Sequence, residues 1–159
     1  HIKNSKLLMS NQLTKSKIQE DLIRFMKSGE KDKVEILRFA SSFIKQEEKD
    51  KNIILSESQT IQVIKKVLKR NQESFEQFTK AGRTDLAAKE KKEIDIISIY
   101  LPEEMTEEAI INVVKLSIEN CKATSIKDMG KVMADVKKTH GNSANMSLVS
   151  KHVKQLLNS

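Results

Sequence analysis

The segment that decides the fold is SESQTIQVIKKVLKRNQESFEQF, residues 56–78. Its apolar residues recur every three or four positions, which is the period of an α-helix and not the two-residue period of a strand. They form one stripe: Ile61, Ile64, Leu68, Phe75 and Phe78. At its start, Ser56 and Gln59 make a capping box, in which each side chain accepts a hydrogen bond from a backbone amide of the first turn. We therefore expect a long helix here that ends near Gly82.

The same period continues on both sides of this segment, so the chain is predicted to be all-α. Helices are expected over about 11–28, 31–49, 56–82, 84–101, 106–121, 127–139 and 147–157. Gly29 is the expected stop of the first helix, and Pro102 closes the fourth because a proline disfavours the α conformation in the residue before it. The expected architecture is a long-helix N-terminal bundle followed by a small three-helix C-terminal domain.

Three parts of the chain follow from this pattern. Residues 1–8 precede Met9, which looks like a natural start, and are expected to be a cloning remnant or an extension. Residues 9–102 are the expected N-terminal helical domain, and residues 103–159 the C-terminal three-helix domain. Because the second domain is small, its core is marginal on its own. It is therefore expected to dock on the first or to swing about Pro102.

Composition excludes several classes of function. The 159 residues include one cysteine, which rules out an internal disulfide framework and favours a reducing compartment. No apolar stretch is long enough to cross a bilayer, so a cytoplasmic protein without a membrane partner is expected. Four glycines form no phosphate-binding loop. The histidines lack ligands at zinc spacing, and Cys121 lies in phase with apolar residues as a core residue would. We therefore expect no catalytic residue, no metal and no cofactor.

Charge is the first positive indication of function. Lys and Arg number 29 against 22 Asp and Glu, a net charge of +7. This favours a polyanionic partner, although a lysine-rich solvated surface explains the total equally well. The surplus is concentrated at the C-terminal end. From Lys122 onward there are seven Lys and two Asp, a net charge of +5 in 38 residues, which is a stronger indication of nucleic-acid binding.

Two groups of side chains are candidate RNA contacts. The predicted contacts in the C-terminal region are Lys127, Lys131, Lys137, Lys138, Asn142, Ser143, Lys151 and Lys154. The loop at residues 140–145 precedes a helix, where backbone amides favour a phosphate. No aromatic residue lies in this region, so contacts to the backbone of a folded RNA suit it better than base stacking. A second basic patch, for which a solvated helix face is an equally good explanation, comprises Lys65, Lys66, Lys69 and Arg70.

Several segments also resemble a known family. They are LKRNQESF at 68–75, FTKAGRTDL at 78–86, EIDIISIYLP at 93–102, DMGKVM at 128–133 and the residues from Val149 onward. In this order they resemble the GatB/YqeY family, in its free-standing YqeY-like form, over about 9–157. Asp128, Gly130 and Lys131 match the family's Asp-Met-Gly-Lys motif, with Asp128 expected to cap the sixth helix. After His140 the family usually has a Gly-Lys/Arg-Ala-Asp-Gly loop, whose cation this sequence lacks.

The resemblance implies a function. The related helical tail belongs to the GatB component of the glutamine-dependent aminoacyl-tRNA amidotransferase, a carbon-nitrogen ligase with glutamine as amido donor, and is taken to hold tRNA. A non-catalytic accessory module that binds tRNA or another structured RNA is therefore the leading expectation. The alternative is an adaptor that docks the amidotransferase or a synthetase.

Overall fold

The computed structural model of the chain describes residues 13–158, and every regular element in that range is helical. The all-α prediction is thus confirmed. The chain folds as two compact units, the first ending at Leu101 and the second beginning at Pro102. The division into domains at residues 9–102 and 103–159, and the docking or swinging of the second domain, stay predictions. The expected remnant at residues 1–8 lies outside the described residues.

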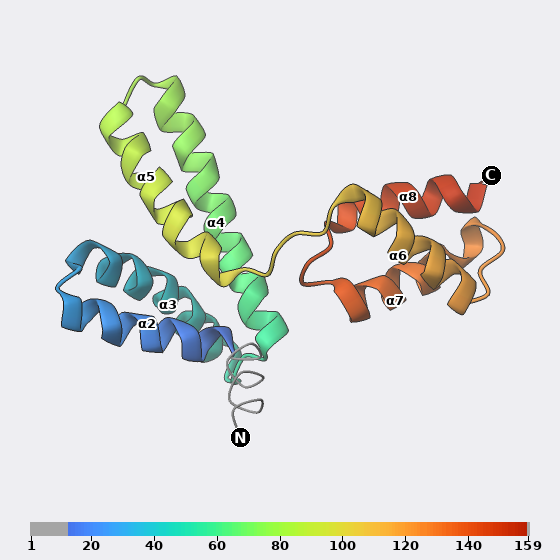
Figure 1. The fold of residues 1–159 in the computed structure, drawn as a ribbon, viewed down its shortest axis with the longest axis horizontal. Coiled ribbons are helices and arrows are strands. Elements are labelled where there is room, and N and C mark those ends of the chain that lie inside the picture. The colour runs from blue at the N-terminus through green and yellow to red at the C-terminus, as the bar shows by residue number, and fades with distance from the viewer. Residues whose placement is uncertain (1–12, 159) are drawn as a thin grey trace. The chain divides into compact units, whose positions relative to one another are not determined.

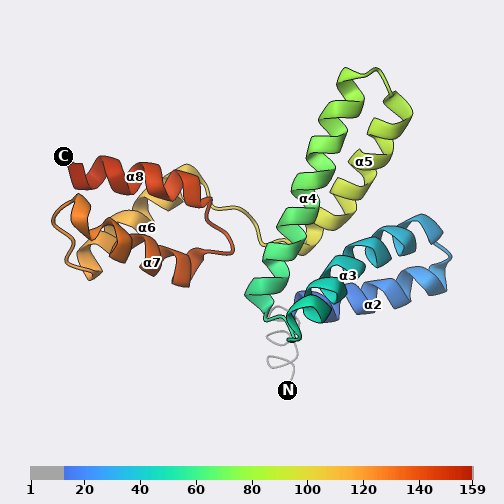
Figure 2. The same cartoon turned by 180° about the vertical axis from the view of Figure 1, so that it is seen from behind.

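The first unit consists of two helical hairpins. The first hairpin pairs α2 (Thr14–Ser28) with α3 (Lys31–Lys51), and the second pairs α4 (Glu57–Lys80) with α5 (Thr84–Ile97), followed by the 3-10 turn η1 (Ser98–Tyr100). The two hairpins diverge from a common base, and this holds when the unit is seen from either side (Figures 1 and 2). The fourth helix was expected to reach residue 101, but α5 ends at Ile97. The turn η1 follows it and ends at Tyr100, two residues before Pro102.

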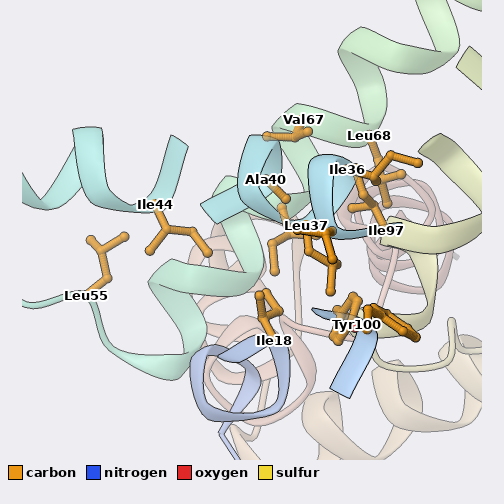
Figure 3. Close-up of a cluster of buried hydrophobic side chains, with 13 residues drawn as sticks. Ile18, Ile36, Leu37, Ala40, Ile44, Leu55, Val67, Leu68, Ile97 and Tyr100 are labelled. Atoms are coloured by element: carbon orange, nitrogen blue, oxygen red, sulfur yellow. The ribbon is translucent and has the colours of Figure 1, made fainter. Parts of the chain in front are cut away.

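The core of the first unit lies at the base of the hairpins. Leu37 of α3, Ile64 of α4 and Ile97 of α5 are each at most 1% exposed, and they pack with the apolar side chains around them (Figure 3). Phe75 and Phe78, expected on the same stripe as Ile64, are only partly buried. The reason is that α4 continues beyond the base and, toward the tip of its hairpin, has only α5 beside it (Figure 1).

Two helices of the first unit begin with different kinds of cap. The start of α4 is capped by a residue close in sequence, and the start of α2 by a residue distant in sequence. The Ser56 hydroxyl accepts from the Gln59 amide at 3.2 Å, and the Gln59 side chain accepts from the Ser56 amide at 2.9 Å, so the predicted capping box is confirmed. The first turn of α2 has no cap of its own. Instead, the carboxylate of Glu57, at the start of α4, accepts from the Thr14 amide at 2.8 Å and from the Thr14 hydroxyl.

The second unit is a three-helix bundle. Its elements are α6 (Glu107–Asn120), the 3-10 turn η2 (Ile126–Asp128), α7 (Met129–His140) and α8 (Met146–Asn158). Valines from α6, α7 and α8, among them Val114, Val132 and Val149, are fully buried in its core. Cys121 packs against this core and is half-buried, in the position expected of a small apolar residue.

Asp128 takes a different role from the one expected of it. Its carboxylate makes no capping bond to α7 but folds back, accepting from the amides of Thr124 at 2.9 Å and Ser125 at 3.4 Å. The bond from the Thr124 amide is the main cause that holds the pKa of Asp128 below its usual value. The expectation failed because the turn η2 precedes α7. The side chain of Asp128 closes the capping box that Ser125 begins at the start of η2, and it is therefore not free to cap α7.

Two glycines provide a test of the backbone geometry of α7: Gly130 near its start and Gly141 just after its end. A Cβ added at Gly141 would lie 2.4 Å from the carbonyl oxygen of Lys137, whereas one added at Gly130 meets nothing within 4 Å. We expect Gly141→Ala to lower the free energy of unfolding by about 1–3 kcal/mol through this clash. Gly130→Ala should raise it by about 0.5–1 kcal/mol, because alanine is the better helix former.

Chemical denaturation of the full chain, followed by circular dichroism, measures both changes. Equal effects of the two substitutions would contradict the assigned backbone geometry.

Candidate nucleic-acid interface

The packing of α7 decides where its lysines point. Val132 and Val136 are buried in the core. The helix turns Lys131 and Lys138 away from the core on one flank of α7, and Lys137 away from it on the other flank. All three lysines are exposed, as is Lys127 in the turn η2 just before α7. The predicted contacts on this helix and its preceding turn therefore lie on the outside of the bundle.

The same arrangement recurs on α8. Val149 and Val153 are fully buried, while Lys151 and Lys154 are exposed one turn apart on the outer side. We refer to these two residues and the exposed lysines of η2 and α7 as the lysine surface: Lys127, Lys131, Lys137, Lys138, Lys151 and Lys154. That all six lie on one common face stays a prediction.

Neighbouring acids offset only part of this charge. The Lys131 amine lies 3.9 Å from a carboxylate oxygen of Asp128, and the Lys151 amine lies 3.8 Å from one of Glu107. Both lysines are exposed, and both pairs are at the edge of ion-pair distance, so they add little stability and are screened by salt.

The other four members, Lys127, Lys137, Lys138 and Lys154, form no ion pair within residues 13–158. Most of the lysine surface is therefore available to an external anion.

The loop before α8 is occupied by its own hydrogen bonds. The side-chain oxygen of Asn145 accepts from the amides of Ser147 at 3.0 Å and Leu148 at 3.4 Å, so it caps α8 where a phosphate was expected to bind. The carbonyl of Ser143 accepts from the Met105 amide at 2.9 Å, which ties the loop to the segment before α6. A phosphate at the first turn of α8 would have to displace Asn145. Asn142 and Ser143 are half-buried, and their role as contacts stays a prediction.

A contact between α6 and α8 escaped the sequence analysis. His152 is 8% exposed, and its Nε2 lies 2.8 Å from a carboxylate oxygen of Glu107, 45 residues earlier. This hydrogen bond, with the nearby charge of Lys151, holds the pKa of Glu107 below its usual value. Spacing along the chain gives no sign of such a pair. The one available signal is that His152 falls on the apolar side of α8, where a buried polar group needs a partner.

The second basic patch is partly engaged within its own unit. Lys66, Lys69 and Arg70 are exposed on α4, whereas Lys65 is half-buried. The guanidinium of Arg70 lies 5.6 Å from the centre of the Phe43 ring on α3. The pKa of Glu47 is lowered mainly by its hydrogen bond from Lys51, and the charge of Lys66 adds a smaller effect. This patch is therefore a weaker candidate than the lysine surface.

Other kinds of site were sought in the same range. Within residues 13–158 no three His, Cys, Asp or Glu side chains are grouped so that they could hold a metal ion. None of the helices described is both long enough and apolar enough to span a membrane.

The fold and its surface define an all-α protein made of two helical hairpins and a three-helix bundle with exposed lysines. A family model described as Yqey-like protein matches residues 15–157. The chain therefore belongs to the YqeY-like family, and the resemblance in the sequence is confirmed.

Two relatives are similar to the chain over much of its length. One is the altered inheritance of mitochondria protein 41, mitochondrial, of Pyrenophora tritici-repentis, which is 29% identical over 146 residues, covering 89% of this chain and 79% of the relative. The other, an uncharacterized protein of Schizosaccharomyces pombe, is 35% identical over 86 residues, covering 54% of this chain and 70% of the relative. The first relative is mitochondrial by name, and the cytoplasmic location expected for this chain stays a prediction.

The contact between Glu107 and His152 predicts an acid-sensitive stability. A carboxylate whose pKa is lowered by folding stabilises the fold above its unfolded pKa, and this contribution is lost as the pH falls through the lower folded value. Glu107→Gln should therefore lower the thermal midpoint at about pH 6 and lower it much less at about pH 3. Glu119→Gln, at an exposed position of the same helix, is the matched control. A difference between wild type and Glu107→Gln that stays constant across this range would contradict the assignment.

Proposed function

We propose that this YqeY-like chain is a non-catalytic module that binds tRNA or another structured RNA through the lysine surface. The observation that carries the proposal is that six lysines of the second unit are exposed and four of them have no acidic partner among the described residues. The resemblance to the helical tail of the amidotransferase that is taken to hold tRNA supports the same choice of ligand.

The chemistry of the surface suits an RNA backbone. Lysine is a compact point charge that attracts phosphate without requiring a fixed hydrogen-bond geometry. The second unit offers no aromatic side chain on which a base could stack. Affinity would therefore come mainly from phosphate contacts, and selectivity from the shape of a folded RNA.

The proposed place of the module is beside the glutamine-dependent aminoacyl-tRNA amidotransferase. In this role the chain positions the RNA, and the carbon-nitrogen ligase chemistry with glutamine as amido donor takes place on another protein. The alternative, an adaptor that docks the amidotransferase or a synthetase, requires a surface for a protein partner.

The salt dependence of binding tests the proposal. We expect total tRNA to be retained by the full chain in filter binding, with an affinity that falls steeply as salt rises. Lys137→Gln combined with Lys138→Gln should lower the affinity and reduce the slope of log K against log salt by about two, one for each lost phosphate contact.

The matched control is Lys45→Gln with Lys49→Gln, two exposed positions on α3 with the same change of charge. It should leave the slope unchanged. Absence of binding at low salt, or equal losses in both double variants, would contradict RNA binding through the lysine surface.

A further inference from the structure

The two hairpins of the first unit diverge (Figures 1 and 2). A groove lies between them and is lined by residues of α3 and α5. It has a volume of about 620 Å³. On α3 it is lined by Asp32, Glu35 and Phe39, and these positions are three and four residues apart, so they form one helical stripe. Asp85, Ala88 and Lys92 repeat the same spacing on α5. The groove is therefore bounded by two helix faces that have no helix between them.

Three of the side chains that line the groove are apolar: Ile36, Phe39 and Ala88. Ile36 is buried, whereas Phe39 is 38% exposed although it is a large aromatic residue, and its ring is held edge-on against Phe43 with the ring centres 4.9 Å apart. Ala88 on the facing helix is exposed and small. This apolar lining can receive an aliphatic or aromatic side chain from a partner.

The rim of the groove carries excess negative charge. Asp32 and Lys92 form an ion pair across the groove and cancel each other. Of the remaining charged groups, Glu35, Asp85 and Glu93 are acidic and Lys89 is basic.

Two of these acids come from opposite helices. Glu93, on α5, is partly buried, and burial is the main cause that raises its pKa. A hydrogen bond from Asn71 opposes this rise, and repulsion from Glu90 and, more weakly, from Glu35 on α3 adds to it. A cation placed between the two helices would lie close to both Glu35 and Glu93.

We propose that this groove binds an amphipathic helix of a partner protein, in which Lys or Arg side chains flank an aliphatic or aromatic anchor. A helix laid between α3 and α5 would complete a three-helix arrangement, with its anchors spaced three and four residues apart. Its cations would meet Glu35 and Glu93, whereas an acidic helix or a nucleic acid would be repelled. This surface lies on α3 and α5, and the proposal is independent of RNA binding by the lysine surface.

The test uses a designed probe, because the partner is defined by its chemistry. The probe is a fluorescein-labelled amphipathic helix of leucine and lysine, about 18 residues or five turns long. The comparison peptide has glutamate in place of every lysine. Fluorescence anisotropy with the full chain should show saturable binding of the lysine peptide and none of the glutamate peptide.

Three variants locate the binding. Glu35→Lys combined with Asp85→Lys reverses the rim, and we expect it to weaken binding at least about tenfold. Ala88→Gln narrows the groove without a change of charge and should weaken binding as well. Glu73→Lys with Glu76→Lys makes the same change of net charge on α4, outside the groove, and should change the affinity less than about twofold. Circular dichroism of each variant establishes that it is folded.

The opposite results overturn the proposal. Failure of the lysine peptide to saturate, or equal weakening by the α4 and groove variants, would show that no such site exists. Self-association of the wild-type chain that Glu35→Lys with Asp85→Lys abolishes, measured by analytical ultracentrifugation, would assign the groove to a second copy instead of a partner protein.

Discussion

The burial of four valines is the constraint on which the proposed function depends. Val132 and Val136 on α7, and Val149 and Val153 on α8, are each at most 1% exposed. Since a helix repeats every 3.6 residues, burying these valines turns Lys131 and Lys138 on α7, and Lys151 on α8, toward the opposite side of each helix. The outward direction of these lysines is thus a consequence of how the small core packs. Rotating either helix so that its lysines faced the core would transfer ammonium groups out of water, which is unfavourable.

Each unit carries one local group of charged side chains on which a proposal rests, and the two groups differ in sign. The second unit presents lysines, most of them without acidic partners among the described residues. The first unit presents a groove lined by Phe39 and by four acidic side chains against two lysines. Neither surface follows from the charge of its whole unit, because residues 1–101 have 21 Lys and Arg against 15 Asp and Glu, and residues 102–159 have eight Lys against seven Asp and Glu. The two proposals therefore rest on local groups of side chains, a polyanion being assigned to the lysines and a cationic helix to the groove.

Local patterns predicted most of the fold, and distant pairings account for what they missed. The capping box of Ser56 and Gln59 and the apolar stripes of the helices depend on residues a few positions apart, so one sequence contains the whole signal. The cap that Glu57 gives to Thr14 joins residues 43 positions apart, and no local pattern marks it.

The site shows the same distinction. Periodicity was sufficient to predict that Lys131 and Lys151 face outward, whereas the bond between His152 and Glu107 required the helices to be packed first. The groove was missed for a related reason. It exists because two hairpins diverge, and the angle between hairpins depends on the whole core around Leu37.

Hydrogen–deuterium exchange of the full chain, with and without bound tRNA, tests the central claim most directly. It reports where the RNA contacts the protein, peptide by peptide, without any substitution. The account predicts slower exchange in α7 and α8 when tRNA is bound, and unchanged exchange along the facing sides of α3 and α5. Protection confined to the hairpins of the first unit, with α7 and α8 unaffected, would contradict it.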